Sequence, residues 1–408
     1  MPSSHSLLVI YGWFLGVGAF ATLVVWAIVW VRIGRGLRGI PTLRRGEKLA
    51  AANPPTGRVC VVIPAHNESR VISALVRSLR AETYPDMRAV LALDRCTDDT
   101  APLAREQIAD DRRFEIVEIE ACPPEWVGKV HALHAGVTRS RGAASADFLL
   151  FADADTAFTP GCIAASLALM RERKLDLLSL LSTLTFHTWF ERIVQPAATL
   201  ELMRQYPLAL ANAATNRRPF ANGQFLLFTR ATYDDIGGHE AVKSSLFEDV
   251  DLARLVDARK RLAGVFLADG LFHCSMYGDW PQFRRGWKRI FMQAAGSNAR
   301  HLTLSAHRTR WLGTLLPLWM LGAAPVGLFL APREPLLGWT LVALGCVAMA
   351  VWLATLVRIT VLARAPLWIA PLHIAGAWLA ARVLDEAASD VRQHRPTQWG
   401  GREYDVRV

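Results

Sequence analysis

A long uncharged segment near the N-terminus limits what this chain can fold into. Residues 7–31 contain no charged side chain, and as an α-helix they would extend roughly 37 Å, enough to cross the hydrocarbon core of a membrane. A cleaved secretory signal has basic residues before a shorter apolar core, whereas here the basic residues Arg32, Arg35 and Arg38 follow it. We expect residues 1–31 to be an uncleaved transmembrane anchor and residues 32–55 a basic juxtamembrane linker, with the chain beyond starting in the cytoplasm.

Two further uncharged runs lie near the C-terminus, at residues 312–331 and 336–357. The short sequence PREP joins them, which predicts a hairpin of spanning helices. A third run, residues 365–381, is shorter and contains His373 and two prolines, so it can span, re-enter or lie in the interface. We expect residues 301–384 to form this membrane region and residues 385–408 a polar tail, whose side of the membrane stays open.

The composition narrows the class of protein. Hydrophobic residues make up 52% of the chain, and the formal net charge is +10. Such a charge suits anionic lipid headgroups, an anionic substrate or nucleic acid. No zinc-finger spacing, RNA-binding aromatic signature or basic tail is present, so we expect no nucleic-acid partner. The six cysteines include no C-x-x-C pair, which favours free thiols in a reducing compartment.

The middle of the chain has the pattern of a soluble α/β domain. Short apolar runs at 58–64, 87–94, 114–120 and 147–155 predict strands, and the segments between them have helical spacing. Strands that alternate with helices predict a mainly parallel sheet. Because ligands bind beyond the carboxyl ends of such strands, we expect residues 64–68, 94–98 and 153–155 to face one crevice.

The stretch DFLLFADADTAF, residues 147–158, ends an apolar strand in Asp153 and Asp155. On an extended segment, side chains two residues apart point the same way, so the two carboxylates can share one ion. Carboxylate oxygens are hard ligands that suit Mg²⁺ or Mn²⁺. The alternative is an ordinary solvated turn, which is the better interpretation of this pattern taken alone.

Several short motifs together resemble family 2 inverting glycosyltransferases, in the membrane-anchored branch that includes hopene-associated, carotenoid and ceramide-type lipid glycosyltransferases. The resemblance implies a nucleotide-sugar-binding (GT-A-like) cytoplasmic domain over residues 56–300, flanked by transmembrane helices. The matching stretches are VVIPAHNE (61–68), ALDRCTDDTA (92–101), WVGKVHALHAG (126–136), FADADTAFTPG (151–161), FANGQFLLFTRATYDDIGGHEAV (220–242), FEDVDLARLV (247–256), MYGDWPQFRRGWKRIF (276–291) and TQWGGREY (397–404).

The resemblance implies roles for individual residues on the donor side. Asp94 matches the carboxylate that binds uracil, although Leu93 stands where the family usually has a second acid. Lys129 matches a basic residue that binds the phosphates. Without the resemblance, Lys129 would be interpreted as a solvated residue at the start of a helix. Asp155, with Asp153, would hold the divalent ion on the diphosphate. The residues expected to bind the nucleotide sugar are Pro64, Ala65, Asn67, Glu68, Asp94, Lys129 and Asp153.

The second half of the domain supplies the expected acceptor side. Asp249 matches the catalytic base, with Glu248 beside it, and its alternative is an acidic first turn of a helix. Gly223 and Gln224 would lie near the sugar and the acceptor. Arg285 and Trp287 belong to a degenerate form of the Q-x-x-R-W motif, one residue too long, and would cover the diphosphate or contact headgroups.

The expected function is transfer of a sugar from a UDP-sugar, such as UDP-glucose or a UDP-N-acetylhexosamine, to a lipid or isoprenoid hydroxyl by metal-assisted single displacement. The enzyme would be a multi-pass protein of a bacterial-type inner membrane, and residues 189–214 would form an interfacial helix. A processive polysaccharide synthase and a non-enzymatic membrane scaffold are the alternatives.

Overall fold

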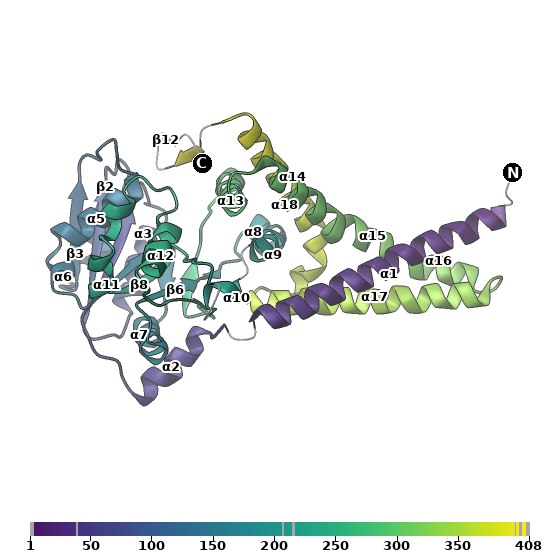
Figure 1. Cartoon of the computed structure of the whole chain (residues 1–408), viewed down its shortest axis with the longest axis horizontal. Helices are drawn as coiled ribbons and strands as arrows, with labels where there is room; N and C mark the ends of the chain where they lie inside the picture. Colours follow the sequence, from purple (N-terminus) through teal and green to yellow (C-terminus); the bar gives the residue numbers. More distant parts are fainter. Residues whose placement is uncertain are drawn as a thin grey trace.

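The computed structural model describes residues 4–37, 40–205, 208–213, 217–395, 397–399 and 402–404. An α/β unit occupies one end of the molecule, and long helices extend from it to the other end, where the N-terminus lies (Figure 1). A layer of shorter helices, among them α8, α9 and α13, lies between these two parts (Figure 1). The order of the parts in space therefore places this helical layer between the sheet and the apolar helices.

The α/β unit is built on a seven-stranded sheet in the order β3-β2-β1-β4-β8-β6-β9. Every pairing is parallel except those of β8, which runs antiparallel to both β4 and β6. This confirms the predicted mainly parallel sheet. The strands are β1 Val59–Ala65, β2 Met87–Asp94, β3 Phe114–Ile119, β4 Phe148–Ala152, β6 Leu177–Leu181, β8 Phe225–Thr229 and β9 Ala263–Leu267.

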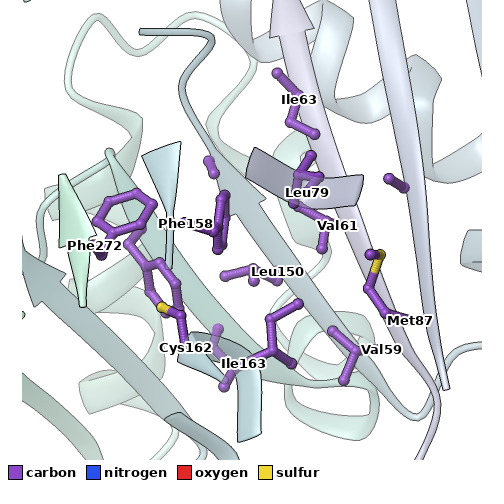
Figure 2. Close-up of a cluster of buried hydrophobic side chains, with 14 of the residues drawn as sticks. Val59, Val61, Ile63, Leu79, Met87, Leu150, Phe158, Cys162, Ile163 and Phe272 are labelled. Atoms are coloured by element: carbon purple, nitrogen blue, oxygen red, sulfur yellow. The ribbon is translucent and has the colours of Figure 1, made fainter. Parts of the chain in front are cut away.

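Side chains alternate across the central strand and build a core on each face of the sheet. Val59, Val61 and Ile63 of β1 belong to one buried cluster, and Cys60 and Val62 to the other. Figure 2 shows the first cluster, where strand residues pack against helix residues such as Leu79. The helices of the α/β unit are α3 Ile72–Arg80, α4 Thr100–Ile108, α5 Gly128–Arg139, α6 Arg141–Ala144, α7 Cys162–Arg173, α11 Arg230–Asp235, the 3₁₀ helix Gly238–Val242 and α12 Glu248–Ala258.

The two acids at 153 and 155 are not on an extended segment, which corrects the prediction. β4 ends at Ala152, and the chain turns before β5, Thr156–Phe158. The Thr156 hydroxyl donates to the Asp153 carbonyl at 2.7 Å and closes this turn. β5 then joins a second sheet in the order β5-β10-β7, with β10 at Phe272–Cys274 and β7 at Thr183–Leu184.

In the described parts of the chain, four helical segments are long and apolar enough to cross a membrane: His5–Gly36, Ala299–Leu330, Pro335–Leu362 and Leu367–Arg392. The second segment, Ala299–Leu330, begins well before the predicted start at residue 312. The reason is that the polar helix α14 continues without a break into the apolar residues that follow it. The third run continues as α18 and is also long enough to span. The elements are α1 Ser4–Leu37, α14 Ala299–Arg310, a π-helical turn Trp311–Leu315, α15 Leu316–Leu321, α16 Ala323–Leu330, α17 Pro335–Leu362, a 3₁₀ helix Leu367–Leu372 and α18 His373–Arg392.

The helical layer has its own core. The predicted helix over residues 189–214 is divided into α8 Trp189–Ile193, α9 Gln195–Gln205 and α10 Leu208–Ala211. Phe190 packs with residues of α13 Trp280–Ala294 and of α18 in one buried cluster. A Cβ at Gly376 of α18 would lie 1.9 Å from the Ile193 carbonyl oxygen, so only glycine allows this close crossing. The remaining elements are α2 Leu43–Ala52 and a hairpin of β11 Thr397–Trp399 with β12 Arg402–Tyr404.

A buried ionic network joins α9 to α14. Glu201 accepts hydrogen bonds from Arg204 at 2.6 Å and from Arg308 at 2.9 Å, and its side chain is almost fully buried. Arg204 also donates to the Ser305 hydroxyl at 3.1 Å. Both guanidinium groups are partly shielded from water, so they depend on this one carboxylate.

The substitution Glu201→Ala tests how strongly this network holds the helical layer together. It leaves two partly buried cations without their partner, so we expect a loss of about 3 kcal/mol in stability. Thermal unfolding of the detergent-solubilised protein measures the change. The control Glu172→Ala removes the partner of Arg45 in a solvent-exposed pair and should cost much less stability, because water screens such pairs. Equal effects of the two substitutions would contradict the structural role of Glu201.

Candidate active site

Acidic side chains converge where β1, β2 and β4 end, at the edge that the parallel topology predicts. These strands are neighbours in the sheet and point the same way. Burial, followed by the nearby charges of Asp155, Asp153 and Asp98, raises the pKa of Glu68 to about 7. The loops that follow these three strands therefore bring their acids within electrostatic reach of one another.

Lys129 lies between two of the predicted site acids. Its ammonium group is 2.7 Å from Asp153 Oδ1 and 2.8 Å from Glu248 Oε1. Burial disfavours the charged lysine, but the two carboxylates outweigh burial and raise the pKa of Lys129 above its ordinary value. Lys129 is the second residue of α5, so the start of this helix places the cation next to the two acids. It thereby connects the turn after β4 to the first turn of α12.

Asp155 is the more deeply placed of the two acids after β4. Its Oδ1 atom is buried and has no hydrogen-bond partner among the described residues. Burial and the charge of Asp153 raise the pKa of Asp155 to about 6, and a hydrogen bond from Cys274 opposes this shift. An orphaned buried carboxylate oxygen next to a second carboxylate is an unfavourable arrangement unless a positive group binds there.

The donor set fits a hard divalent cation that other oxygens complete. No group of three or more His, Cys, Asp or Glu residues in the described parts of the chain is arranged to hold a metal ion. Mg²⁺ characteristically takes one or two protein carboxylates together with phosphate oxygens and waters, so two acids suffice. His273 is not in this set: its Nε2 lies 3.1 Å from the Gly270 carbonyl oxygen.

Asp249 occupies the start of α12, where its carboxylate is held in place by the backbone. Oδ2 accepts the Gly223 N–H at 2.8 Å, and Oδ1 accepts the Val250 N–H at 2.8 Å. Burial, followed by the neighbouring Glu248 charge, raises the pKa of Asp249 to about 7, against the opposing effect of Lys129. A carboxyl group with such a pKa can exchange a proton near neutral pH, as a general base must.

Gly223 allows Asp249 and Lys129 to lie together. A Cβ at this position would be 3.2 Å from Asp249 Oδ2 and 3.2 Å from Lys129 Nζ. Gln224, the next residue, has its amide oxygen bonded to the Ser182 hydroxyl and, at 3.2 Å, to Asn222 Nδ2. The NGQF stretch therefore lies directly beside the proposed base.

The substitution Gly223→Ala should displace the Asp249 carboxylate without removing any charged group. We expect the rate of the reaction at this site to fall on the order of tenfold to a hundredfold, because small errors in the position of a reacting group are costly. Gly161→Ala is a useful comparison, since no atom lies within 4 Å of the Cβ it would add, although its positive φ adds backbone strain. An unchanged rate in Gly223→Ala would show that the close contact is unimportant.

At the end of β2, Asp94 is paired with its own neighbour. Arg95 donates to Asp94 Oδ1 at 2.8 Å and to Oδ2 at 2.6 Å, and the Asp94 side chain is buried. Arg95 was not singled out from the sequence, and its place directly after Asp94 was the available signal. Asn67 Oδ1 accepts the Thr97 N–H at 2.8 Å and connects this loop to the one after β1, where Pro64 and Ala65 lie at the end of the strand.

Two of the four basic residues of α13 are paired with acids of α18. Arg284 lies 2.7 Å from Glu386 of α18, and Lys288 pairs with Asp390 of the same helix. Trp287 is buried in the core of the helical layer, whereas Arg285 is exposed. Sequence reasoning considered the basic residues of α13 but missed the acids of α18 that face them.

A comparison with models of known protein families identifies the family of this chain. A family model described as "Glycosyltransferase like family 2" matches residues 54–269, more than half of the 408-residue chain. The chain belongs to this family. It is therefore a glycosyltransferase that uses a nucleotide sugar, and the predicted GT-A-like fold is confirmed by the family match together with the sheet. The roles of the individual site residues remain predictions.

Three known proteins are similar to this chain. The 4,4'-diaponeurosporenoate glycosyltransferase of Staphylococcus haemolyticus is 23% identical over 274 residues, which cover 65% of this chain and 67% of that protein. A mannosyltransferase from Pyrobaculum calidifontis, solved with GDP-Man and Mn²⁺, is 16% identical with a TM-score of 0.46, covering 93% of this chain and 99% of that one. S. aureus TarS, solved with UDP-GlcNAc, is 13% identical with a TM-score of 0.40, covering 85% and 95%.

Proposed function

We propose that this family 2 glycosyltransferase moves a sugar from a UDP-sugar to a hydroxyl group of a lipid or isoprenoid acceptor by inverting single displacement. The observation that carries the proposal is the arrangement around Lys129, which places Asp153 and Glu248 within 2.8 Å of one ammonium group. The proposed donor side, with Asp153, and the proposed acceptor side, where Glu248 directly precedes Asp249, would thus lie next to each other. Single displacement needs this proximity.

On the donor side, the loops after β1 and β2 would hold the nucleotide. Asp94 and Arg95 together present a hydrogen-bond acceptor beside donors, which complements the N3–H and the carbonyl oxygens of uracil. Pro64, Ala65, Asn67 and Glu68 would line the pocket. This complementarity supports a UDP-sugar as the donor, and UDP-glucose or a UDP-N-acetylhexosamine is the proposed one.

The leaving diphosphate needs positive charge. Asp155, through its unpartnered Oδ1, and Asp153 would hold Mg²⁺ or Mn²⁺. When bound, the ion would neutralise charge that develops on the diphosphate. Lys129 would contribute a second positive charge from the same side, fixed in position by its two ion pairs.

On the acceptor side, Asp249 would take the proton of the attacking hydroxyl. The two backbone N–H groups that donate to Asp249 fix its orientation, and burial keeps the pKa close to 7, where the base is both available and strong enough. Glu248 would keep Lys129 in place.

The acceptor is proposed to be a membrane lipid. Four segments are long and apolar enough to span a membrane, and the relative from S. haemolyticus is named for 4,4'-diaponeurosporenoate, a carotenoid-type acceptor. Residues 1–31 and 301–384 would be the membrane parts of a bacterial-type inner-membrane protein, with residues 56–300 on the cytoplasmic face and 32–55 and 385–408 as linker and tail. Anionic headgroups would lie near its basic residues.

A donor panel tests this function. The purified protein in lipid nanodiscs is given radiolabelled UDP-glucose, UDP-N-acetylglucosamine or GDP-mannose, with Mg²⁺ or Mn²⁺ and a bacterial membrane lipid extract. We expect one UDP-sugar to label a species that partitions into organic solvent, only when the ion is present. Labelling from GDP-mannose alone, or of a water-soluble polymer alone, would contradict the proposal.

A further inference from the structure

The ionic network between α9 and α14 contains one more cation than anion. The guanidinium groups of Arg204 and Arg308 both pair with the Glu201 carboxylate, at 2.6 Å and 2.9 Å. Each arginine side chain is 33% exposed, whereas that of Glu201 is 5% exposed. In the described part of the chain, neither arginine forms an ion pair with another acid. One positive charge of this network therefore has no counterpart within it.

The two arginines do not share Glu201 equally. Arg204 uses two nitrogens, with Nε at 3.0 Å from Oε2 and Nη2 at 2.6 Å from Oε1, which is the full paired contact of a guanidinium with a carboxylate. Arg308 donates to Glu201 and to the Ser305 hydroxyl through Nη2 alone among the described residues. The Nε and Nη1 groups of Arg308 are thus left for another acceptor, and its charge is the one in excess.

Arg308 lies at the depth where a spanning helix meets lipid headgroups. It belongs to the last turn of α14, and residues 311–331, which follow directly, contain no charged side chain. The segment Ala299–Leu330 is long and apolar enough to cross a membrane. Basic side chains at the end of such a segment lie among the phosphate groups of the bilayer.

Apolar side chains flank Arg308 on the exposed face of α14. Leu304 and Trp311 are large and exposed, and they lie four residues before and three residues after Arg308, so the three share one side of the helix. An exposed tryptophan at this position is typical of the membrane–water interface. On α9, Met203 next to Arg204 is exposed as well. The excess cation therefore opens onto a surface that acyl chains can cover.

We propose that Arg308, with Arg204 beside it, binds the phosphate group of an anionic phospholipid, whose acyl chains lie along Leu304 and Trp311. A phosphodiester carries one negative charge, which matches the one excess positive charge, and guanidinium nitrogens bind phosphate oxygens in pairs. The bound lipid would hold α9, which lies between the α/β unit and the long apolar helices (Figure 1), against the membrane part. This site goes beyond the proposed sugar transfer, to which none of these residues is assigned.

Native mass spectrometry of the detergent-solubilised protein, titrated with phosphatidylglycerol or phosphatidylcholine, tests the site. We expect tighter binding of phosphatidylglycerol, because the choline of the other lipid opposes the arginine charge. Arg308→Gln should raise the apparent Kd for phosphatidylglycerol about tenfold, the effect of losing charged hydrogen bonds. The variant should still fold, since Glu201 keeps its paired contact with Arg204. Arg308→Lys, which keeps the charge without the planar fork, should retain part of the affinity.

The matched control is Arg254→Gln. It removes one positive charge from an exposed pair with Asp251 on α12. It changes the net charge of the protein as Arg308→Gln does, so general attraction to an anionic lipid falls equally in both. We expect its Kd for phosphatidylglycerol to stay at the wild-type value. Equal Kd values for Arg308→Gln and Arg254→Gln would overturn the proposal.

Thermal unfolding gives a readout with opposite signs for the acid and the base of the network. Without lipid, Glu201→Gln should lower the unfolding temperature more than Arg308→Gln, since it leaves two cations unpaired. Phosphatidylglycerol should then raise the unfolding temperature of Glu201→Gln more than that of the wild type, and that of Arg308→Gln less. A purely structural ion pair has no such dependence on lipid, so equal rises in the three proteins would also overturn the proposal.

Glycerophosphate, which has the phosphate but no acyl chains, distinguishes a lipid site from a site for free phosphate. We expect it to raise the unfolding temperature much less than phosphatidylglycerol at the same concentration. Equal rises would overturn the assignment to a lipid. None of these readouts requires turnover. A protein that binds phosphatidylglycerol through Arg308 but transfers no sugar would refute the proposed function and leave this site intact.

Discussion

Asp249→Asn is expected to lower the rate of sugar transfer by a factor on the order of 10² to 10⁴, which is the usual contribution of a general base. The asparagine can keep the contact with the Gly223 N–H through its carbonyl oxygen, so the fold and the donor affinity should remain. Because the acceptor hydroxyl then has no group to take its proton, kcat falls more than the KM for the donor rises. Initial rates over a range of donor concentrations measure both constants.

Asp251→Asn is the matched control for this prediction. Asp251 lies on the same helix, but its carboxylate bonds to Ser245 and Arg254 instead of facing the crevice. We expect its rate to stay within a few-fold of the wild type. Equal losses in the two variants would mean that Asp249 acts only through the stability of α12.

The pH dependence of transfer gives an independent check on the base. Burial raises the pKa of Asp249 to about 7, and only the deprotonated carboxylate can accept a proton. The rate should therefore rise as the pH increases through about 7 and then level off, and this rise should be absent in Asp249→Asn. A flat profile in the wild type between pH values about one unit below and above 7 would contradict the assignment.

Asp155→Asn is expected to abolish metal-dependent transfer while making the metal-free protein more stable. Burial and Asp153 raise the pKa of Asp155 to about 6, whereas an unfolded aspartate titrates near about 4. The folded state thus binds the proton more tightly. The resulting penalty grows as the pH rises from about 4 to about 6 and is fully present at neutral pH. Removing this charge should stabilise the protein at pH 7 by about 1 to 2 kcal/mol.

Asp153→Asn is the informative comparison, because the same chemical change should have the opposite effect on stability. Asp153 is bonded to the buried Lys129, so its loss leaves the ammonium with Glu248 alone. We expect a lower unfolding temperature for Asp153→Asn and a higher one for Asp155→Asn, both measured without metal. Adding Mn²⁺ should raise the unfolding temperature of the wild type more than that of either variant. A drop in stability for Asp155→Asn would show that the unpartnered Oδ1 of Asp155 does not destabilise the folded protein.

Much of the sheet could be predicted from the sequence, because its parallel strands are encoded locally. The apolar run that became β1, Val59–Ala65, alternates between two buried faces and is followed by a helix with clear periodicity. The antiparallel insertion of β8 between β4 and β6 depends on long-range pairing, which no local pattern reports. The unpredicted turn at Asp153 has the same origin, because β5 leaves the main sheet to pair with β10, more than a hundred residues later.

In the candidate site, too, some features follow from local sequence and others depend on long-range packing. The acids at strand ends could be predicted because parallel strands end at one edge, and Glu68, Asp153 and Asp155 do lie within electrostatic reach of one another. The pairing of Lys129 with Glu248 could not be predicted, since it depends on how α5 and α12 both pack against the 3₁₀ helix Gly238–Val242. The acids of α18 that neutralise α13 were missed for a similar reason: their partners lie about a hundred residues away in the chain.

The stereochemistry of the product tests single displacement most directly. The nucleotide sugar selected by the donor panel, isotopically labelled at its anomeric carbon, is incubated with the protein, the divalent ion and the lipid extract, and the purified glycolipid is examined by NMR. UDP-glucose and UDP-N-acetylglucosamine carry α-linked sugars, so attack by a hydroxyl that Asp249 activates, opposite the diphosphate, predicts a β-linked product. An α-linked product would contradict the account, because retention requires two displacements or a different face of attack.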